Sequence, residues 1–190
     1  MRLNQLASSN CAHWTDVFRK NMPSIKLSFS KLGPGSEPLL TNLFEHYGHD
    51  MSEWLDIDTN PDGRYAFDTS KFWTESYAVH LAKSGDSIAG FAIVGSASTW
   101  LGGDSSAHDV SEFFVLRKFR RAGVGRQLAE FIWNAHPGEW LVRVIEANRP
   151  AVAFWRGVVA IYTNGAYTDE RVLDNNRHWR FLRFGVRSAK

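Results

Sequence analysis

Residues 113–129 combine a hydrophobic run, a basic turn with two glycines and a segment with helical spacing. Gly123 and Gly125 lack Cβ atoms, so a phosphate group can approach the backbone closely at these positions. A strand that leads into a helix through such a turn presents free backbone N–H groups at the helix N-terminus, and these groups bind phosphate. The stretch therefore predicts an anion site, with a solvated basic turn as the alternative interpretation.

The order Arg120-x-x-Gly123-x-Gly125 resembles the acetyl-CoA-binding motif of the GCN5-related N-acetyltransferase (GNAT) family. A second segment, Asn148-x-x-Ala151-x-x-Phe154-Trp155, follows a predicted strand at 140–145. It is similar to the part of that family where one strand diverges from its neighbour and a helix begins. The two motifs occur in the family's order, and the resemblance covers residues 24–186, which is most of the chain.

The resemblance implies acetyl-CoA as the co-substrate. Backbone groups of Phe113 and Val115 would pair with the pantetheine amides as an added strand does, and the loop N–H groups would hold the pyrophosphate. Asn148 would contact the pantetheine arm or hold the diverging strand, whereas Phe154 and Trp155 would line the cofactor or pack in the core. The cofactor-binding residues so implied are Phe113, Phe114, Val115, Arg120, Arg121, Ala122, Gly123, Val124, Gly125, Arg126, Asn148, Ala151, Phe154 and Trp155.

Amide formation needs a neutral amine, a polarised thioester carbonyl and a proton for the leaving thiolate. In the family the amine attacks acetyl-CoA directly, and the thioester oxygen would be held by a backbone N–H near Val115. Asp109 and Glu112 precede the cofactor motif, where family members often carry a carboxylate. Their opposite parity along the strand predicts that they lie on different faces, so only one points into the site. We favour Glu112.

Trp155 stands where many family members carry a tyrosine that protonates the thiolate. An indole N–H donates a hydrogen bond but not its proton at neutral pH. Tyr162, Tyr167 or water must then supply the proton. Cys11, the single cysteine, lies outside the region of resemblance, which argues against a thiol acyl-enzyme.

Charge and aromatic residues suggest where the acceptor binds. Residues 45–68 contain seven acidic side chains and one fixed cation, whereas from residue 110 onward fourteen Lys or Arg accompany seven Asp or Glu. This asymmetry indicates either a basic half for the cofactor and an acidic half for a cationic acceptor, or two solvated faces. The candidate acceptor-binding residues are Tyr47, Asp50, Glu53, Trp54, Asp56, Tyr65, Trp73 and Trp100, and core packing is the alternative for the aromatic ones.

These features favour transfer of an acetyl group to a primary amine of a small cationic molecule. General similarity to small-molecule acetyltransferases gives the most specific expectation, a 2′-N-acetyltransferase for an aminoglycoside-type, kasugamycin-like antibiotic, so that acetylation would confer resistance. The alternatives are a protein lysine or N-terminal acetyltransferase, and a non-catalytic module that binds CoA or nucleic acid.

Periodicity and turn residues predict a chain of the α/β (α+β) class in which strands and helices are mixed. The resemblance implies the GNAT fold, with a mixed, mostly antiparallel sheet, a central splayed parallel pair and flanking helices. Residues 1–22 are expected to form an N-terminal extension, and 23–190 the acetyltransferase domain. The predicted strands are 22–30, 76–82, 88–94, 109–116, 140–145, 166–172 and 178–186, and the predicted helices are 39–47, 124–134 and a short one at 151–159.

Composition narrows the class of protein. The 190 residues suit one domain, hydrophobic content is 44%, and a net charge of +2 gives no overall basic excess for nucleic acid. The lone cysteine and the lack of a signal sequence or an apolar run of ~18 residues indicate a cytoplasmic chain without a membrane partner. His46, His49 and His80 show no metal-ligand spacing, so no metal is expected. The family resemblance adds a homodimer as an expectation.

Overall fold

The computed structural model describes residues 26–103 and 105–187. These residues form one seven-stranded sheet of order β1-β2-β3-β4-β5-β7-β6. All neighbours are antiparallel except β4 and β5, as expected from the sequence. The strands are β1 (Leu27–Lys31), β2 (Ala78–Ser84), β3 (Ser87–Ser96), β4 (His108–Val115), β5 (Gly138–Ile145), β6 (Thr168–Asp174) and β7 (Arg177–Val186).

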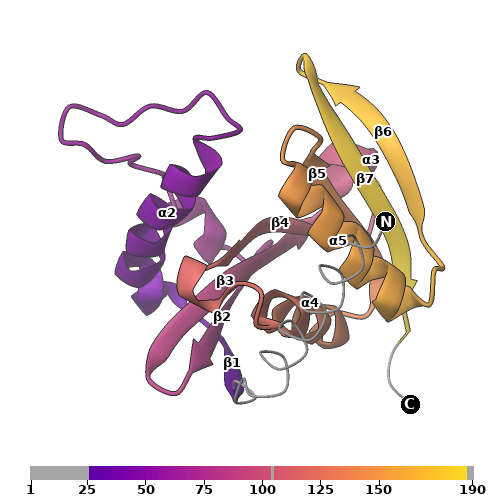
Figure 1. The fold of residues 1–190 in the computed structure, drawn as a ribbon, viewed down its shortest axis with the longest axis horizontal. Helices are drawn as coiled ribbons and strands as arrows, with labels where there is room; N and C mark the ends of the chain where they lie inside the picture. Colours follow the sequence, from indigo (N-terminus) through magenta and orange to yellow (C-terminus); the bar gives the residue numbers. More distant parts are fainter. Residues whose placement is uncertain (1–25, 104, 188–190) are drawn as a thin grey trace, which may run out of the picture.

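Helices cover both faces of this sheet (Figure 1). Alternate residues of β2 point to opposite faces, so Val79 packs with α2 and Ala82 packs with α4 and α5. The helices are α2 (Glu37–Met51), α3 (Ser98–Leu101), α4 (Val124–Ala135) and α5 (Arg149–Thr163), with single 3-10 turns at Pro34–Ser36, Ser70–Trp73 and Arg117–Phe119. None of the helices among the described residues is long and apolar enough to cross a membrane.

Two features differ from the sequence prediction. Helix α5 is not short: it begins at Arg149 and continues to Thr163, where Asn164 (φ 56°) and Gly165 (φ 82°) end it in the left-handed conformation. Such residues commonly terminate helices. The four-residue helix α3 was not predicted. The proposed extension at 1–22, and Cys11 within it, lie outside the described residues.

A β-bulge interrupts β4 opposite β3. Ile93 pairs with Glu112, and the next residue, Val94, pairs with Val110, which leaves Ser111 as the extra residue. An extra residue shifts the alternation of side chains beyond it. Val110 and Phe113 therefore both face the core under α4 and α5, and Glu112 faces α2. The prediction that Asp109 and Glu112 lie on different faces is wrong, because it assumed a regular strand.

A partly buried histidine pair joins the sheet to the end of α4. The Nε2 atoms of His80 on β2 and His136 lie 2.9 Å apart, and His80 is only 3% exposed. Burial, followed by the charges of His136 and Lys31, lowers the pKa of His80 to about 4. Below the unfolded-state value of 6.5, protonation therefore favours the unfolded chain.

We expect stability from this pair to be complete above about pH 6.5 and to be lost as the pH falls towards about 4. A His80→Gln variant should lose less thermal stability than the parent between these pH values, whatever its Tm at pH 7. A His46→Gln variant, altered on the exposed face of α2, is the control. Equal pH slopes of Tm for parent and His80→Gln would contradict this role.

Candidate active site

The turn between β4 and α4 has the geometry of a phosphate site. Arg121 (φ 62°) and Gly123 (φ 80°) adopt left-handed conformations directly before α4. The first backbone bond of the helix runs from Gln127 N–H to the Gly123 carbonyl. Among the described residues, the N–H groups from Arg121 to Gly125 have no hydrogen-bond acceptor. Five consecutive donors at a helix N-terminus fit the pyrophosphate of CoA.

The two glycines of this turn serve different purposes. Gly123 has open space around it, so its conformation rather than its size demands glycine. At Gly125 a Cβ atom would lie 3.0 Å from the Phe154 ring and 3.6 Å from Val115. Gly125 is therefore needed for the close approach of α4 to α5 and β4, in addition to any contact with phosphate.

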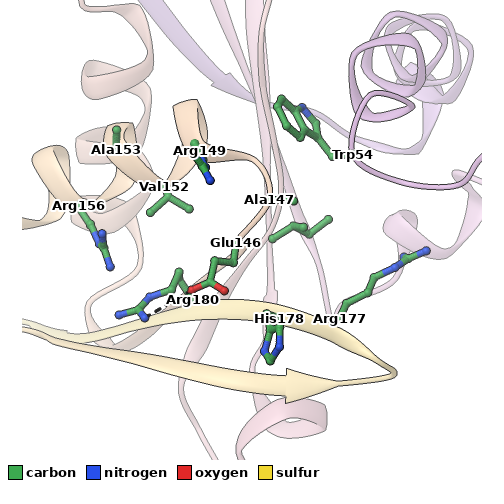
Figure 2. Close-up of a pocket in the computed structure, with 11 residues that line it drawn as sticks. Trp54, Glu146, Ala147, Arg149, Val152, Ala153, Arg156, Arg177, His178 and Arg180 are labelled. Atoms are coloured by element: carbon green, nitrogen blue, oxygen red, sulfur yellow. Dashed lines mark ion pairs between the residues drawn. The ribbon is translucent and has the colours of Figure 1, made fainter.

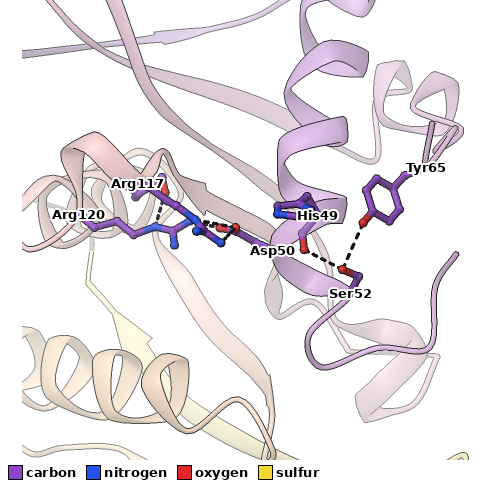
Figure 3. A network of polar contacts seen from close by, with 7 residues as sticks. His49, Asp50, Ser52, Tyr65, Arg117 and Arg120 are labelled. Carbon is purple, nitrogen blue, oxygen red and sulfur yellow. Dashed lines mark hydrogen bonds and ion pairs between the residues drawn. The ribbon is translucent and has the colours of Figure 1, made fainter. Parts of the chain in front are cut away.

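Asp50 ties the end of α2 to this turn (Figure 3). Its carboxylate accepts hydrogen bonds from the Arg117 and Arg120 guanidinium groups, and Arg120 Nε also donates to the Val115 carbonyl at 2.7 Å. Burial raises the pKa of the Asp50 carboxyl, but the two arginines outweigh it and leave the pKa below its ordinary value. Asp50 thus neutralises the arginines and does not present a free carboxylate to an acceptor, contrary to the prediction.

Strands β4 and β5 pair only at their beginnings, through His108–Trp140 and Asp109–Leu141. The backbone edge of β4 beyond this point is open, as the predicted splay requires. Leu116 N–H donates to Ala89 on β3, so by alternation the backbone groups of Phe113 and Val115 point away from β3 and toward the opening. The backbone groups implied for pantetheine binding are therefore correctly oriented.

Asp109 closes the base of the splay. Its carboxylate accepts bonds from Arg143 Nε at 2.9 Å, from Arg143 Nη2 at 2.7 Å and from Ser111 Oγ at 3.0 Å. The Asp109 side chain is 2% exposed, and the guanidinium lies 4.1 Å from the centre of the Trp100 ring. Both carboxylate oxygens of Asp109 are engaged, so its role is structural, and the prediction that it is a catalytic candidate is not supported.

Glu112 is the carboxylate that remains for chemistry. It lies at the bulge, where Tyr47 of α2 donates a hydrogen bond to its Oε2 at 2.6 Å. Burial raises the pKa of the Glu112 carboxyl, and the bond from Tyr47 and the charges of Lys71 and Arg143 lower it only in part. A partly buried glutamate with a raised pKa is a candidate base.

Of the aromatic residues of α5 considered as proton donors, one packs in the core and the other lies far from the opening between β4 and β5. Trp155 is 6% exposed, and its ring centre lies 4.7 Å from that of Phe113, so it packs in the core. Tyr162 lies two turns further along α5, about 10 Å, and its hydroxyl donates to Asn134. The prediction of Tyr162 as the proton donor is not supported, because this position is at the far end of the helix. Tyr167 precedes β6 and packs against the same core.

The remaining implied cofactor residues have local partners. Asn148 caps α5 by accepting from Ala151 N–H at 3.0 Å, which supports its predicted role at the splayed strand. Phe114 is buried on the α2 face, so its side chain does not face the core under α4 and α5. Arg126 lies 3.7 Å from Glu130 on the same helix.

The residues predicted for acceptor binding do not form one site. Tyr65 folds back onto α2, where its hydroxyl donates to Ser52, Trp73 packs in the α2 core, and Trp100 stacks on Arg143. Glu53 and Asp56 are exposed and line none of the described pockets. Of these residues, Tyr47 contacts Glu112, and Trp54 lines a cleft elsewhere in the structure.

That cleft measures about 710 Å³ and lies between the end of β5, the start of α5 and the start of β7 (Figure 2). Four arginines line it, at 149, 156, 177 and 180, together with His178 and Glu146. None of these residues was predicted from the sequence. The basic excess after residue 110 was visible, but the folding of β7 against α5 was needed to gather the arginines.

The sequence model of the acetyltransferase (GNAT) family matches residues 43–158. This range includes the phosphate turn, the splayed strands, Glu112 and Asn148. The chain therefore belongs to the GNAT family and is an N-acetyltransferase that uses acetyl-CoA.

Solved structures agree on the fold. An acetyltransferase from Thermus thermophilus is 14% identical with a TM-score of 0.60, and the match covers 87% of this chain and all of the other. The protein yncA from Salmonella typhimurium, solved with its cofactor acetyl-CoA, is 12% identical with a TM-score of 0.57 over 86% and 95% of the two chains. A spermidine N-acetyltransferase from Vibrio cholerae, in complex with CoA and spermine, is 10% identical with a TM-score of 0.59 over 84% and 95%. No match is found among the curated proteins.

We expect Gly123→Ala to weaken CoA binding by about tenfold, because a Cβ at a left-handed position costs roughly 1–2 kcal/mol and would displace the loop donors. Isothermal titration calorimetry with CoA measures the change. Gly157→Ala is the matched control, since Gly157 lies within α5 with open space around it. Unchanged affinity of a folded Gly123→Ala variant would contradict the assignment of this loop.

Proposed function

We propose that this acetyltransferase transfers the acetyl group to a primary amine of a small molecule, with Glu112 as the base. The observation that supports this most directly is the partly buried Glu112–Tyr47 pair at the bulge of β4. Acetyl-CoA supplies the activated acetyl thioester. The remaining steps fall to side chains and backbone groups at the opening between β4 and β5.

Glu112 has two tasks in this proposal. Its carboxylate attracts the ammonium form of the acceptor and then accepts a proton, directly or through water, so that the amine becomes nucleophilic. A raised pKa brings the base closer to neutral pH, which makes proton acceptance more favourable. Tyr47 orients the carboxylate by donating to one of its two oxygens.

Backbone groups on β4 complete the arrangement. Those of Phe113 and Val115 bind the pantetheine arm, and an N–H near Val115 stabilises the thioester oxygen as negative charge develops. The Val115 carbonyl is partly engaged by Arg120, which fixes the edge of the strand. Trp155 cannot donate a proton, Tyr162 is remote, and Tyr167 packs against the core ahead of β6, so water protonates the departing thiolate.

The narrower expectation of an aminoglycoside acceptor, and hence of antibiotic resistance, stays a prediction. It comes from general similarity and not from a motif. The acidic segment that suggested a cationic acceptor gives it little support, because Asp50 is paired with arginines and Glu53 and Asp56 line none of the described pockets. A cytoplasmic location and a homodimer also remain predictions.

A thiol-release assay with acetyl-CoA tests the proposal against aminoglycosides including kasugamycin, polyamines, amino acids and peptides. We expect release with a small amine and a mass gain of one acetyl group on that amine. Turnover with protein N-termini or lysines alone would favour the protein acetyltransferase. Salt-dependent DNA binding without thiol release would favour a non-catalytic module.

We expect Glu112→Gln to reduce kcat by about 10²–10⁴-fold, the usual contribution of a general base, with the KM for acetyl-CoA nearly unchanged. Tyr47→Phe removes a hydrogen bond that lowers the pKa of Glu112. The acid limb of its pH–rate profile should therefore move to higher pH. Glu170→Gln, altered at an exposed position of β6, is the control. A Glu112→Gln enzyme with parental kcat would exclude this base.

A further inference from the structure

The cleft between β5, α5 and β7 is basic, although the chain as a whole is nearly neutral. Figure 2 shows the side chains of Arg149, Arg156, Arg177 and Arg180 around it, with Trp54 on the opposite wall. Glu146 is the one acidic residue in its lining. Such a composition does not suit the polycationic acceptor expected from the sequence.

Two of the arginines are held in place by carboxylates. Arg156 Nε donates to Asp169 at 2.6 Å and Arg180 Nε donates to the same carboxylate at 2.8 Å. Glu146, for its part, accepts from Arg171 Nε at 2.7 Å. These contacts fix the guanidinium groups on the β7 and α5 walls without cancelling their charge, because three arginines share two carboxylates.

The other two arginines are available to a ligand. Arg149 and Arg177 are exposed and form no ion pair with any residue of 26–103 or 105–187. Arg149 is also the first residue of α5, where the helix dipole adds positive potential. His178 lies beside them in the cleft. The cleft therefore carries a net positive charge.

This cleft is separate from the phosphate turn but adjoins the opening between the strands. Arg149, Ala153 and Arg156 lie on the side of α5 away from Ala151 and Phe154, which belong to the cofactor motif. Ile145, also in the lining, ends the strand that diverges from β4, and Ala147 lies in the turn that follows it. A molecule in the cleft would thus lie against the β5 wall of the acetyl-transfer site, outside the CoA path.

We infer that the cleft binds an anionic group of the acceptor, so that the natural acceptor is an amine that also carries a carboxylate or a phosphate. This inference rests on the proposed function of the same site. Arg177 and Arg149 bind the anionic oxygens, because a guanidinium presents paired donors that match them. The Trp54 ring and the apolar surface of Val152 and Ala153 contact the carbon skeleton.

Pairs of acceptors that differ only in the anionic group test this inference. Glycylglycine is compared with glycylglycine amide, and phosphoethanolamine with ethanolamine, by thiol release from acetyl-CoA. We expect kcat/KM to be about tenfold or more higher for the anionic acceptor of at least one pair, as one charge-assisted hydrogen bond provides. The pair that shows the preference tells whether a carboxylate or a phosphate is recognised.

The Arg177→Gln variant should lose this preference while its KM for acetyl-CoA stays unchanged. Arg183→Gln is the matched control, because Arg183 is exposed on the same strand but does not line the cleft. Equal turnover of neutral and anionic acceptors would overturn the anion subsite and leave the proposed function intact. A raised KM for acetyl-CoA in Arg177→Gln would also overturn the anion subsite, because the cleft would then belong to CoA. If none of the small amines is acetylated, the proposed function itself is refuted.

Discussion

The early end of the pairing between β4 and β5 is the constraint on which the rest of the molecule depends. Only two residue pairs join these strands, and the buried Asp109–Arg143 ion pair holds them together at that point. Breaking a buried pair by removing one partner typically costs about 3–5 kcal/mol. On the N-terminal side of the Asp109–Arg143 ion pair, β4 is paired with β5. On its C-terminal side, the backbone of β4 is free to bind an extended ligand.

Three helices surround the opening between β4 and β5, and each supplies groups to it. Helix α4 begins beside it with free N–H groups, α5 begins with the Asn148 cap, and α2 supplies Tyr47 to Glu112. Asp50 at the end of α2 binds the arginines of the phosphate turn. The cofactor loop and the candidate base are thus connected through one helix, and displacement of α2 would disturb both.

The two halves of the reaction are recognised by opposite means. In the proposed function, the cofactor is bound largely by backbone groups, which local sequence can specify. In the proposed anion subsite, the acceptor is selected by side chains at strand ends and on α5. That proposal departs from the cationic acceptor expected from the acidic segment, where Asp50 is paired with arginines and Glu53 and Asp56 line none of the described pockets.

The sequence by itself determined the family and a mostly antiparallel sheet with one parallel pair. It predicted the phosphate turn as well, because glycines, a strand and a helix adjacent in the chain define that turn locally. It also identified Glu112 as the favoured carboxylate, although its parity argument failed, since the bulge at Ser111 appears only when β4 pairs with β3. Only the tertiary structure showed that Asp109 is neutralised by Arg143, 34 residues away, that Tyr47 contacts Glu112 across 65 residues, and that four arginines share one cleft. Such contacts depend on which elements pack together, and residue spacing along the chain does not contain that information.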